Sequence, residues 1–342
     1  MPSKCHPKLR VAAVQAAPVY FDIDGTIDKT INLMKEAADQ GVDLISFPET
    51  WIPGYPWWIW LMTPAEGMQK YVQKYFDNSL EVGSPEFQRI ADAAKNLGIY
   101  VSIGFSERDA GSLYIAQALF DKEGKLVKTR RKLKPTHVER SVFGDGDGSD
   151  LSVEKLPIGN VGMLCCWEHL QPLTKYAMYA QNEQIHLAAW PSFSMYNGIA
   201  NALSGEVNTS VSQVYAVEGQ CFFVGASAVV SQEMQAFLCG DDESRKALLA
   251  LGGGFARIFA PDGSSLGTIL EPDQEGLIIA DIDLSVISLS KSAADPAGHY
   301  ARPDVTRLFL NKTPGDRVVT QWNPEPIPET LTENIPELED AK

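Results

Sequence analysis

The 342-residue sequence has little cysteine and no surplus of positive charge. Its five cysteines are odd in number, and their spacing fits neither a disulfide framework nor a C-x-x-C zinc pattern. The 29 Lys and Arg residues against 44 Asp and Glu residues give a net charge of −15. This charge argues against nucleic acid and membrane surfaces as partners, because both attract basic patches. No apolar run approaches the roughly 20 residues that a membrane span requires. We therefore expect a reduced protein without structural metal.

The two ends of the sequence differ from its body. The first residues, Met1 to His6, lack the apolar segment of a signal peptide. Together with the use of cysteine, this absence predicts a cytoplasmic protein. From Trp322 onward, acidic and proline residues dominate, which is typical of a solvated, extended tail. We predict one domain over residues 1–310 and an acidic, Pro-rich tail over residues 311–342.

Strand-like and helix-like segments alternate along the predicted domain. Strands are expected at 9–17, 42–47, 99–105, 114–120, 161–166, 185–190, 221–230, 255–260 and 277–282. Helices are expected between Asp22 and Gly41, between Ser84 and Gly98, over 173–180, and along the valines Val207, Val211, Val214 and Val217. The mixture of helix-separated and hairpin-like strands indicates an α/β domain in which helices pack on stacked sheets.

Three apolar segments end in reactive side chains. Glu49 follows residues 44–47, a basic cluster precedes a proline turn, and Cys166 ends the segment that begins at Val161. A thiol attacks as the thiolate, a nearby cation lowers its pKa, and a carboxylate within reach can take its proton. Brought together, these groups would suffice for nucleophilic attack on an electrophilic carbon. The basic cluster consists of Lys128, Arg130, Arg131, Lys132 and Lys134.

Each of these side chains also has a structural interpretation. Cys165 and Cys166 can be buried thiols that pack as small hydrophobes, and Glu49 can be a loop carboxylate that caps a turn. Basic runs are usually solvated, so at most one or two of these cations are expected to point inward. His169, three residues after Cys166, and His137 are both candidates for a Cys–His dyad. A metal site would need a second pair of ligands near His169, and the sequence offers none.

Taken in order, three motifs resemble those of the carbon–nitrogen hydrolases of the nitrilase superfamily, and within it those of bacterial nitrilases. The motifs are Phe47-Pro48-Glu49, the run from Arg131 to Thr136 with Glu139-Arg140 after it, and Cys166-Trp167-Glu168-His169. The resemblance extends from residues 11–15 to residues 298–304. It implies a four-layer αββα sandwich and no cofactor.

The same resemblance implies roles for four residues. By motif position, Glu49 matches the general base and Cys166 the nucleophile. Lys132, rather than Lys134, matches the lysine that stabilises developing negative charge, because it directly follows the arginine and precedes the Leu-x-Pro-Thr turn. Glu139 matches a second glutamate of the family site. Cys165 is expected to serve packing, since Cys166 is the cysteine directly before the Trp-Glu pair.

The activity implied by the resemblance is hydrolysis of small-molecule organic nitriles to carboxylic acid and ammonia through a covalent cysteine intermediate, with amide as a possible by-product. Three alternatives stay open at this point: an amidase or carbamoylase with the same triad, a cyanide hydratase or dihydratase, and a catalytically silent scaffold. The family also implies a homo-oligomer built from dimers that can grow into spirals.

Two aromatic-rich segments are candidates for the walls of a substrate pocket. One directly follows Glu49, and the other follows the strand expected at 185–190. An apolar pocket beside the base would suit an aromatic, arylaliphatic or aliphatic nitrile. A structural aromatic cluster or a subunit contact would use the same residue types. The candidate substrate-binding residues are Tyr55, Trp57, Trp167, Pro191 and Phe193.

Overall fold

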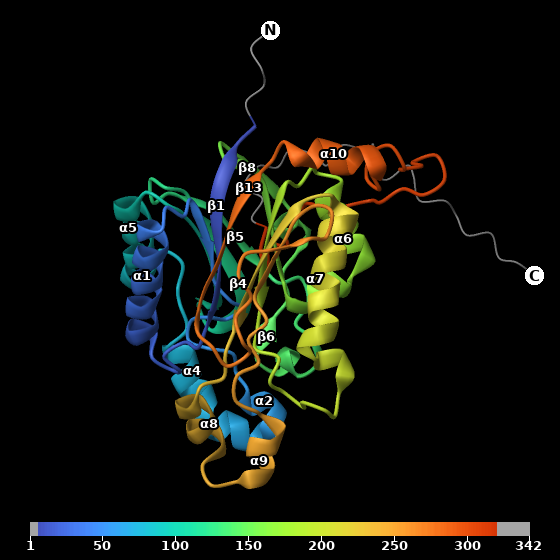
Figure 1. The fold of residues 1–342 in the computed structure, drawn as a ribbon. Helices are drawn as coiled ribbons and strands as arrows, with labels where there is room; N and C mark the ends of the chain where they lie inside the picture. Colours follow the sequence, from blue (N-terminus) through green and yellow to red (C-terminus); the bar gives the residue numbers. More distant parts are fainter. Residues whose placement is uncertain (1–5, 320–342) are drawn as a thin grey trace, which may run out of the picture.

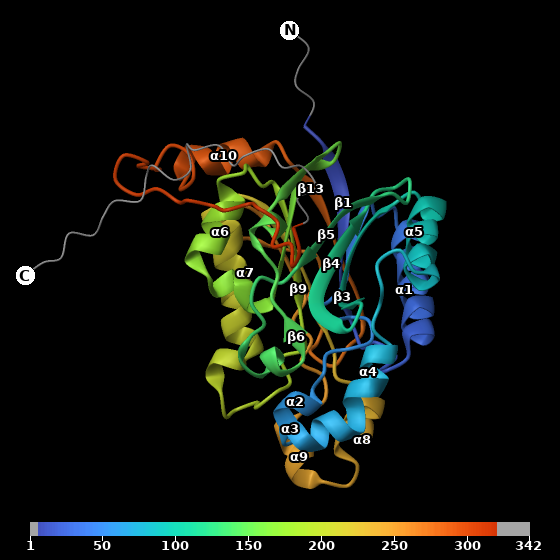
Figure 2. The same ribbon diagram turned by 180° about the vertical axis from the view of Figure 1, so that it is seen from behind.

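The computed structural model describes residues 6–319, whose helices and strands lie in four layers (Figure 1). Helices α1 (Ile23–Asp39) and α5 (Pro85–Leu97) cover one outer face. Helices α6 (Pro172–Tyr179) and α7 (Gly205–Gly219) cover the other, and the strands lie between them. The view from behind shows the same order of layers (Figure 2). This is the αββα sandwich that the sequence predicted.

The remaining elements complete the two sheets and close the ends of the molecule. The strands are β1 (Lys8–Ala16), β2 (Leu44–Ser46), β3 (Tyr100–Asp109), β4 (Ser112–Phe120), β5 (Leu126–Arg131), β6 (Phe143–Gly144), β7 (Val153–Leu156), β8 (Gly159–Cys165), β9 (Ile185–Trp190), β10 (Phe222–Ala228), β11 (Arg257–Phe259), β12 (Ser265–Leu266) and β13 (Gly276–Asp283). The other helices are α2 (Trp58–Leu61), α3 (Pro64–Gly67), α4 (Gln73–Asp77), α8 (Gln232–Cys239), α9 (Glu243–Leu248) and α10 (Val286–Ala293), with a π-helix at Met68–Val72.

The strands follow the order β5-β4-β3-β2-β1-β10-β9-β8-β7, so β1 to β5 build one sheet and β7 to β10 the other. The sheets join where β1 pairs in parallel with β10 at only two positions, Gln15 with Ser227 and Ala16 with Ala228. Along the rest of its length β1 pairs with the antiparallel strand β13. The sheets diverge from this short junction and can therefore stack face to face.

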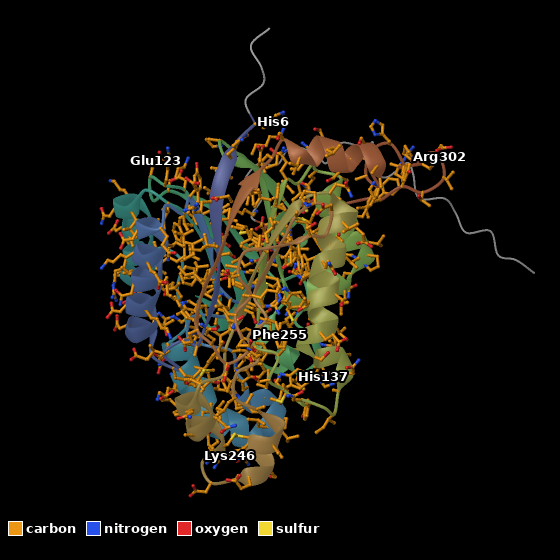
Figure 3. The ribbon with its side chains drawn as sticks, in the orientation of Figure 1. His6, Glu123, His137, Lys246, Phe255 and Arg302 are labelled. Atoms are coloured by element: carbon orange, nitrogen blue, oxygen red, sulfur yellow. The ribbon has the colours of Figure 1, made fainter. Side chains whose placement is uncertain are left out.

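Three apolar layers fill the spaces between the four structural layers. The central layer joins side chains of both sheets, such as Val11 and Leu119 with Met163 and Leu187. A second layer lies under α1 and α5, and a third lies under α6 and α7. Side chains occupy the whole interior, with His6 and Arg302 at one end of the molecule and Lys246 at the other (Figure 3). The burial of these layers supplies most of the driving force for the fold.

Two helices begin and end where the sequence signals placed them. The side chain of Asp22 accepts a hydrogen bond from Gly25 N at the start of α1. The side chain of Ser84 accepts one from Phe87 N at the start of α5, and Gly98 ends that helix in the left-handed region with φ 67°. The capping residues thus fix the ends of both helices on this outer layer.

Helix α7 forms where predicted, but its valine face is not the buried one. Val214 and Val217 are 47% and 41% exposed. The buried residues of α7 are Gly205, Asn208, Ser212, Tyr215, Ala216 and Gly219. A Cβ atom on Gly219 would come within 2.6 Å of the Tyr179 ring, so close packing selects a small residue there. The valines along which the helix was expected therefore do not mark its buried face.

Helices α2, α3, α4, α8 and α9 lie together at one end of the sandwich (Figure 2), and the sequence predicted none of them. Their segments are short, at most eight residues, too short for a clear helical period. Within residues 6–319, no helix is long and apolar enough to cross a membrane. The predicted acidic tail falls mainly on residues 320–342, which lie outside the described residues.

Candidate active site

Four charged or nucleophilic side chains from separate elements meet at one end of the sheets. Glu49 lies three residues beyond β2, Lys132 directly follows β5, and Cys166 directly follows β8. The Lys132 ammonium donates hydrogen bonds to Glu49 Oε1 and to Glu139 Oε2, both at 2.8 Å. All three charged side chains are buried. The residues that the motifs singled out therefore lie in direct contact.

Glu139 is held by a capped turn. It lies in the 3-10 helix His137–Ser141, and the backbone N–H of Thr136 donates to Glu139 Oε2 at 2.6 Å. The hydroxyl of Tyr55 donates to the other carboxylate oxygen at 2.7 Å. With Lys132 these donors fix the carboxylate from three sides, so Glu139 has little freedom to rotate.

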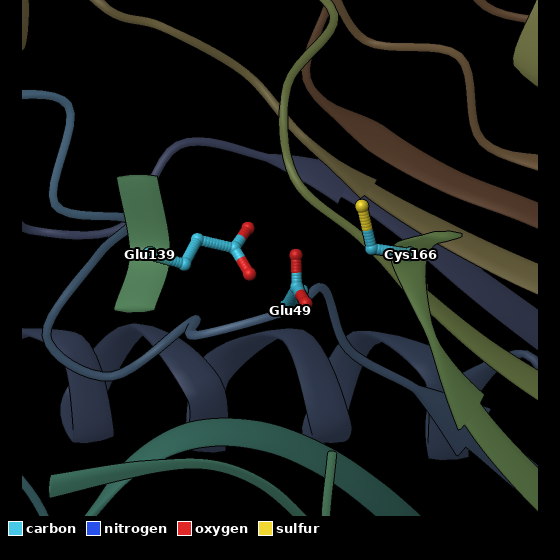
Figure 4. Close-up of side chains that lie close together, drawn as sticks. All are labelled: Glu49, Glu139 and Cys166. Atoms are coloured by element: carbon cyan, nitrogen blue, oxygen red, sulfur yellow. The ribbon is translucent and has the colours of Figure 1, made fainter. Parts of the chain in front are cut away.

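Cys166 begins the 3-10 helix Cys166–Leu170 and has φ +46°, in the left-handed region that is uncommon for residues other than glycine. Its Sγ atom and single carboxylate oxygens of Glu49 and Glu139 all lie within 4.8 Å of one another. Figure 4 shows these three side chains pointing toward one another. Such a group can ligate a metal ion, but here the Lys132 ammonium already holds both carboxylates. A positive charge at this point disfavours a second cation.

Burial shifts the protonation of the site. It raises the pKa of Glu49, an effect that the charge of Lys132 opposes and that of Glu139 reinforces. Burial also raises the pKa of the Cys166 thiol, with Glu49 adding to the effect, while Lys132 and the backbone N–H of Trp167 lower it. Lys132 thus lowers this thiol pKa, as expected for a nearby cation, but burial raises it by more. The thiol is therefore protonated at rest and needs a base to become a nucleophile.

One carboxylate oxygen is left free to act as that base. Glu49 Oε1 accepts from Lys132, whereas Glu49 Oε2 is buried and has no hydrogen-bond partner. An unpaired buried carboxylate oxygen is costly to retain. A proton taken from a thiol, or a water molecule bound during the reaction, would satisfy it.

Two members of the basic cluster point inward, as many as the sequence analysis allowed. One is Lys132, and the other is Arg130, which forms a bidentate ion pair with Glu168 at 2.7 and 2.8 Å. Glu168 also accepts from the backbone N–H groups of Cys165 and Leu133. This carboxylate ties the loop after β5 to the loop after β8, and so sets Lys132 beside Cys166. The sequence analysis gave Glu168 no such role.

A pocket opens above Cys166 and is lined mainly by apolar side chains. All five predicted wall residues line it: Tyr55, Trp57, Trp167, Pro191 and Phe193. The sequence analysis missed six further lining residues: Trp60, Thr136, Ser192, Met195, Leu203 and Asn208. Trp60, Ser192 and Met195 lie in the two aromatic-rich segments, so a wider choice would have found them. Leu203 and Asn208 carry no sequence signal. Asn208 accepts a hydrogen bond from the indole N–H of Trp167 at 3.0 Å and so fixes that wall.

Neither histidine forms the suggested Cys–His dyad. His169 Nδ1 lies 2.6 Å from the backbone oxygen of Cys166, not on its thiol, and its ring extends into the core. His137 stacks on Trp60 instead. Cys165 is buried in an apolar cluster, as expected for a packing residue.

An αββα sandwich with a buried cysteine, a lysine and two glutamates beneath an apolar pocket is the arrangement of a hydrolase that acts on carbon–nitrogen bonds. Residues 10–291 match the carbon-nitrogen hydrolase family. The chain belongs to this family, whose members act on carbon–nitrogen bonds.

Three relatives of high identity agree with this assignment. The chain is 58% identical over 311 residues to a nitrilase of Pseudomonas syringae pv. syringae (strain B728a), covering 91% of this chain and 92% of the relative. It is 54% identical to an arylacetone-specific nitrilase of Alcaligenes faecalis, covering 89% of this chain and 85% of the relative. It is also 52% identical to an aliphatic nitrilase of Rhodococcus rhodochrous, with 89% and 82% covered. Within the family, the chain groups with the nitrilases.

Solved structures share the fold at much lower identity. A carbon-nitrogen hydrolase from Helicobacter pylori G27 superposes with a TM-score of 0.68 at 16% identity, covering 87% of this chain and 96% of the other. An amidase from Nesterenkonia sp. gives a TM-score of 0.59 at 19% identity, with 83% and 93% covered. These likenesses concern the sandwich alone.

Proposed function

We propose that the protein hydrolyses organic nitriles to carboxylic acid and ammonia, with Cys166 as nucleophile, Glu49 as general base and Lys132 as the stabilising cation. The observation that carries the proposal is the Lys132 ammonium held between two buried carboxylates, with the Cys166 thiol beside them at the base of an apolar pocket. No cofactor is needed for this chemistry, since the attacking groups are all side chains and water.

The first step forms the covalent intermediate. Glu49 takes the thiol proton of Cys166, the sulfur adds to the nitrile carbon, and Glu49 then passes that proton to the nitrile nitrogen. The product is a thioimidate. Charge that develops on nitrogen is stabilised by Lys132 and by the backbone N–H of Trp167.

The second half of the reaction releases the products. A water molecule gives a proton to Glu49 and adds to the thioimidate carbon. Cleavage of the carbon–nitrogen bond expels ammonia and leaves a thioester on Cys166, which a second water hydrolyses to the acid and the free thiol. If the carbon–sulfur bond breaks first, the same tetrahedral intermediate yields amide. Glu139 holds Lys132 in place through both halves.

The pocket supports a substrate with an apolar body. Aromatic side chains, among them Trp57 and Phe193, line the space above Cys166. They suit an aromatic, arylaliphatic or aliphatic nitrile, and they leave a one-carbon substrate with few contacts. The names of two relatives, one arylacetone-specific and one aliphatic, fit the same range.

We also infer a homo-oligomer built from dimers that can extend into spirals. The outer face of the α6 and α7 layer exposes the aliphatic side chains of Leu173, Val214 and Val217, and an exposed apolar patch of this kind favours association. Replacement of Leu173 and Val214 by glutamate is expected to lower the assembly mass in light scattering. An unchanged mass would place the contact elsewhere.

Localisation and domain limits complete the proposal. The four described cysteines are free thiols, as in proteins of a reducing compartment, which supports a cytoplasmic location. We also propose a catalytic domain over residues 1–310 and a separate tail over residues 311–342; the family match over residues 10–291 lies within that domain.

The experiment that tests the function is ammonia release from matched nitriles and amides. Phenylacetonitrile, benzonitrile, an aliphatic dinitrile, cyanide and the corresponding amides are compared, with Cys166→Ala as control and products identified by chromatography. Acid and ammonia from organic nitriles, absent in the variant, are expected. Activity on amides alone would make the protein an amidase, and activity on cyanide alone a cyanide hydratase or dihydratase.

A further inference from the structure

A buried hydrogen-bonded network that the reaction itself does not use begins at the backbone of the nucleophile. His169 Nδ1 lies 2.6 Å from the Cys166 carbonyl oxygen, and His169 Nε2 lies 2.8 Å from His186 Nε2. His186 Nδ1 lies 2.7 Å from Glu183 Oε1, and the hydroxyl of Tyr215 donates to Glu183 Oε2 at 2.7 Å. We call His169, His186, Glu183 and Tyr215 the histidine network; each is at most 1% exposed.

Proton counting fixes the order of this network. The three contacts from the Cys166 carbonyl to Glu183 each need one proton, and the carbonyl oxygen carries none. His169 must therefore hold its proton on Nδ1, and His186 must donate from Nε2. The two imidazoles supply two protons when both are neutral, and the third lies in the contact between His186 Nδ1 and Glu183. Burial raises the pKa of Glu183 and lowers that of His186, so this proton lies on Glu183, which donates to His186 Nδ1. The complete network has no net charge, which suits its burial.

Loss of the third proton cannot be accommodated without breaking a contact. An ionised Glu183 would draw the remaining proton of His186 to Nδ1, leaving the lone pair of His186 Nε2 facing His169. His169 then either loses its hydrogen bond with His186, or moves its proton from Nδ1 to Nε2 and no longer donates to the Cys166 carbonyl. In both cases the Cys166 carbonyl is held less firmly.

That carbonyl belongs to the peptide unit whose N–H stabilises the thiolate. The carbonyl of Cys166 and the N–H of Trp167 lie in one rigid plane and point in opposite directions. A donor on the carbonyl therefore aims the N–H toward the site, where it lowers the pKa of the Cys166 thiol. The positive φ of Cys166 is strained and needs such outside support.

The buried surroundings of Glu183 favour its protonated, neutral carboxyl form. A Cβ atom on Gly162 would come within 1.9 Å of Glu183 Oε1, so the strand there must carry glycine. Burial raises the pKa of Glu183 to about 8, opposed only by the hydrogen bond from Tyr215. Burial lowers the pKa of both His169 and His186. Other titratable or charged groups also face the network. Tyr179 and Cys221 lie beside Glu183, and Arg130 and Glu168 lie beside the histidines. At the other end, Glu49, Glu139 and Lys132 lie beside Cys166.

We propose that His169, His186 and Glu183 are positioning residues that aim the Trp167 N–H at the reacting nitrogen by holding the Cys166 carbonyl, and that this grip requires the proton on Glu183. The proposal rests on Cys166 being the nucleophile. Ionisation of Glu183 lowers the rate, whereas ionisation of the base Glu49 raises it, so the two titrations have opposite signs in a pH profile.

The first test compares pH profiles of kcat for the wild type, Glu183→Gln and Tyr215→Phe. A glutamine amide donates to His186 permanently, so Glu183→Gln keeps its rate at neutral pH and loses the alkaline fall, which in the wild type is about fivefold for one hydrogen bond. Tyr215→Phe removes the hydroxyl that lowers the pKa of Glu183 and shifts the alkaline fall upward by roughly half a unit to one unit.

The second test replaces the donor on the carbonyl. His169→Leu is expected to lower kcat per titrated active site by roughly 10- to 100-fold, because one stabilising donor is misplaced. KM stays within about twofold, since the pocket walls are untouched. His169→Asn, whose amide nitrogen can take the place of Nδ1, recovers most of the loss. A merely structural role would lower the amount of folded protein and leave these ratios unchanged.

The rate of Cys166 alkylation by iodoacetamide, measured against pH, gives a readout that needs no nitrile turnover. In the wild type this rate is expected to rise less steeply above pH 8 than in Glu183→Gln. This holds even if the natural substrate is an amide, so failure of the network and failure of the nitrilase assignment are distinguishable. Identical alkaline limbs in the wild type and Glu183→Gln, or an undiminished kcat in folded His169→Leu, would overturn the proposal.

Discussion

Arg130 and Glu168 form a bidentate ion pair beneath the nucleophile, and both side chains are at most 4% exposed. The pair does not touch the pocket. Its carboxylate also receives the backbone N–H groups of Cys165 and Leu133, so it joins the two loops that carry Lys132 and Cys166. The relative positions of Lys132 and Cys166 thus depend on the Arg130–Glu168 ion pair, which lies beneath the pocket.

Arg130→Met is expected to destabilise the protein by about 3–5 kcal/mol, because it leaves the Glu168 carboxylate buried without its partner. The matched control is Arg131→Met, on the next residue of β5, whose ion pair with Glu107 is partly exposed. That change is expected to cost about 1–2 kcal/mol. Urea unfolding measures both. Equal losses would show that Arg130 has no special role.

Lys132→Met is expected to lower kcat by roughly 10³-fold or more, since it removes the cation that faces developing charge. The control is Lys134→Met, two residues on, whose side chain is 64% exposed and pairs with Asp145 at the surface. It should retain full activity. Steady-state kinetics with the preferred nitrile decide between them, and comparable losses would mean that the wrong lysine was assigned.

Glu139→Gln is expected to move the acid limb of the kcat profile to lower pH while reducing the maximum rate. The negative charge of Glu139 raises the pKa of Glu49, so its removal lets Glu49 ionise at lower pH. Since the base acts only when ionised, activity then persists further into acid. A pH profile of kcat tests this shift, and a move of the acid limb to higher pH would be the contrary result.

Phe193→Leu is expected to raise KM for phenylacetonitrile more than for an aliphatic nitrile, by a difference of about 1–3 kcal/mol in kcat/KM. Phe193 lines the pocket above Cys166. Phe309→Leu is the control, because Phe309 is 86% exposed. Kinetics on both substrates give the comparison. A uniform change across the two nitriles would remove Phe193 from the part of the wall that selects substrates.

Three short motifs resemble those of the carbon–nitrogen hydrolases, and this resemblance implied the sandwich and singled out Glu49, Lys132, Glu139 and Cys166. The residues alone indicated only helices packed on stacked sheets, with a carboxylate, a basic cluster and a thiol after separate apolar segments. The catalytic roles of these residues stay a prediction.

What could not be predicted depends on contacts between distant segments. Glu168 meets Arg130 across 38 residues of sequence, and Tyr215 meets Glu183 across 32, and no local pattern encodes either. The valines of α7 did not indicate its buried face, because packing against Tyr179 and the sheet selects glycine and serine on that face. Close packing can thus override a hydrophobic period.

The most direct test of the account is mass spectrometry of the enzyme quenched in acid during turnover of an organic nitrile. The account predicts that the peptide containing Cys166 gains the mass of the whole nitrile, as the thioimidate, or of the corresponding acyl group, as the thioester, and that Cys166→Ala shows neither. Turnover by Cys166→Ala, or an adduct on another residue in its place, would contradict it.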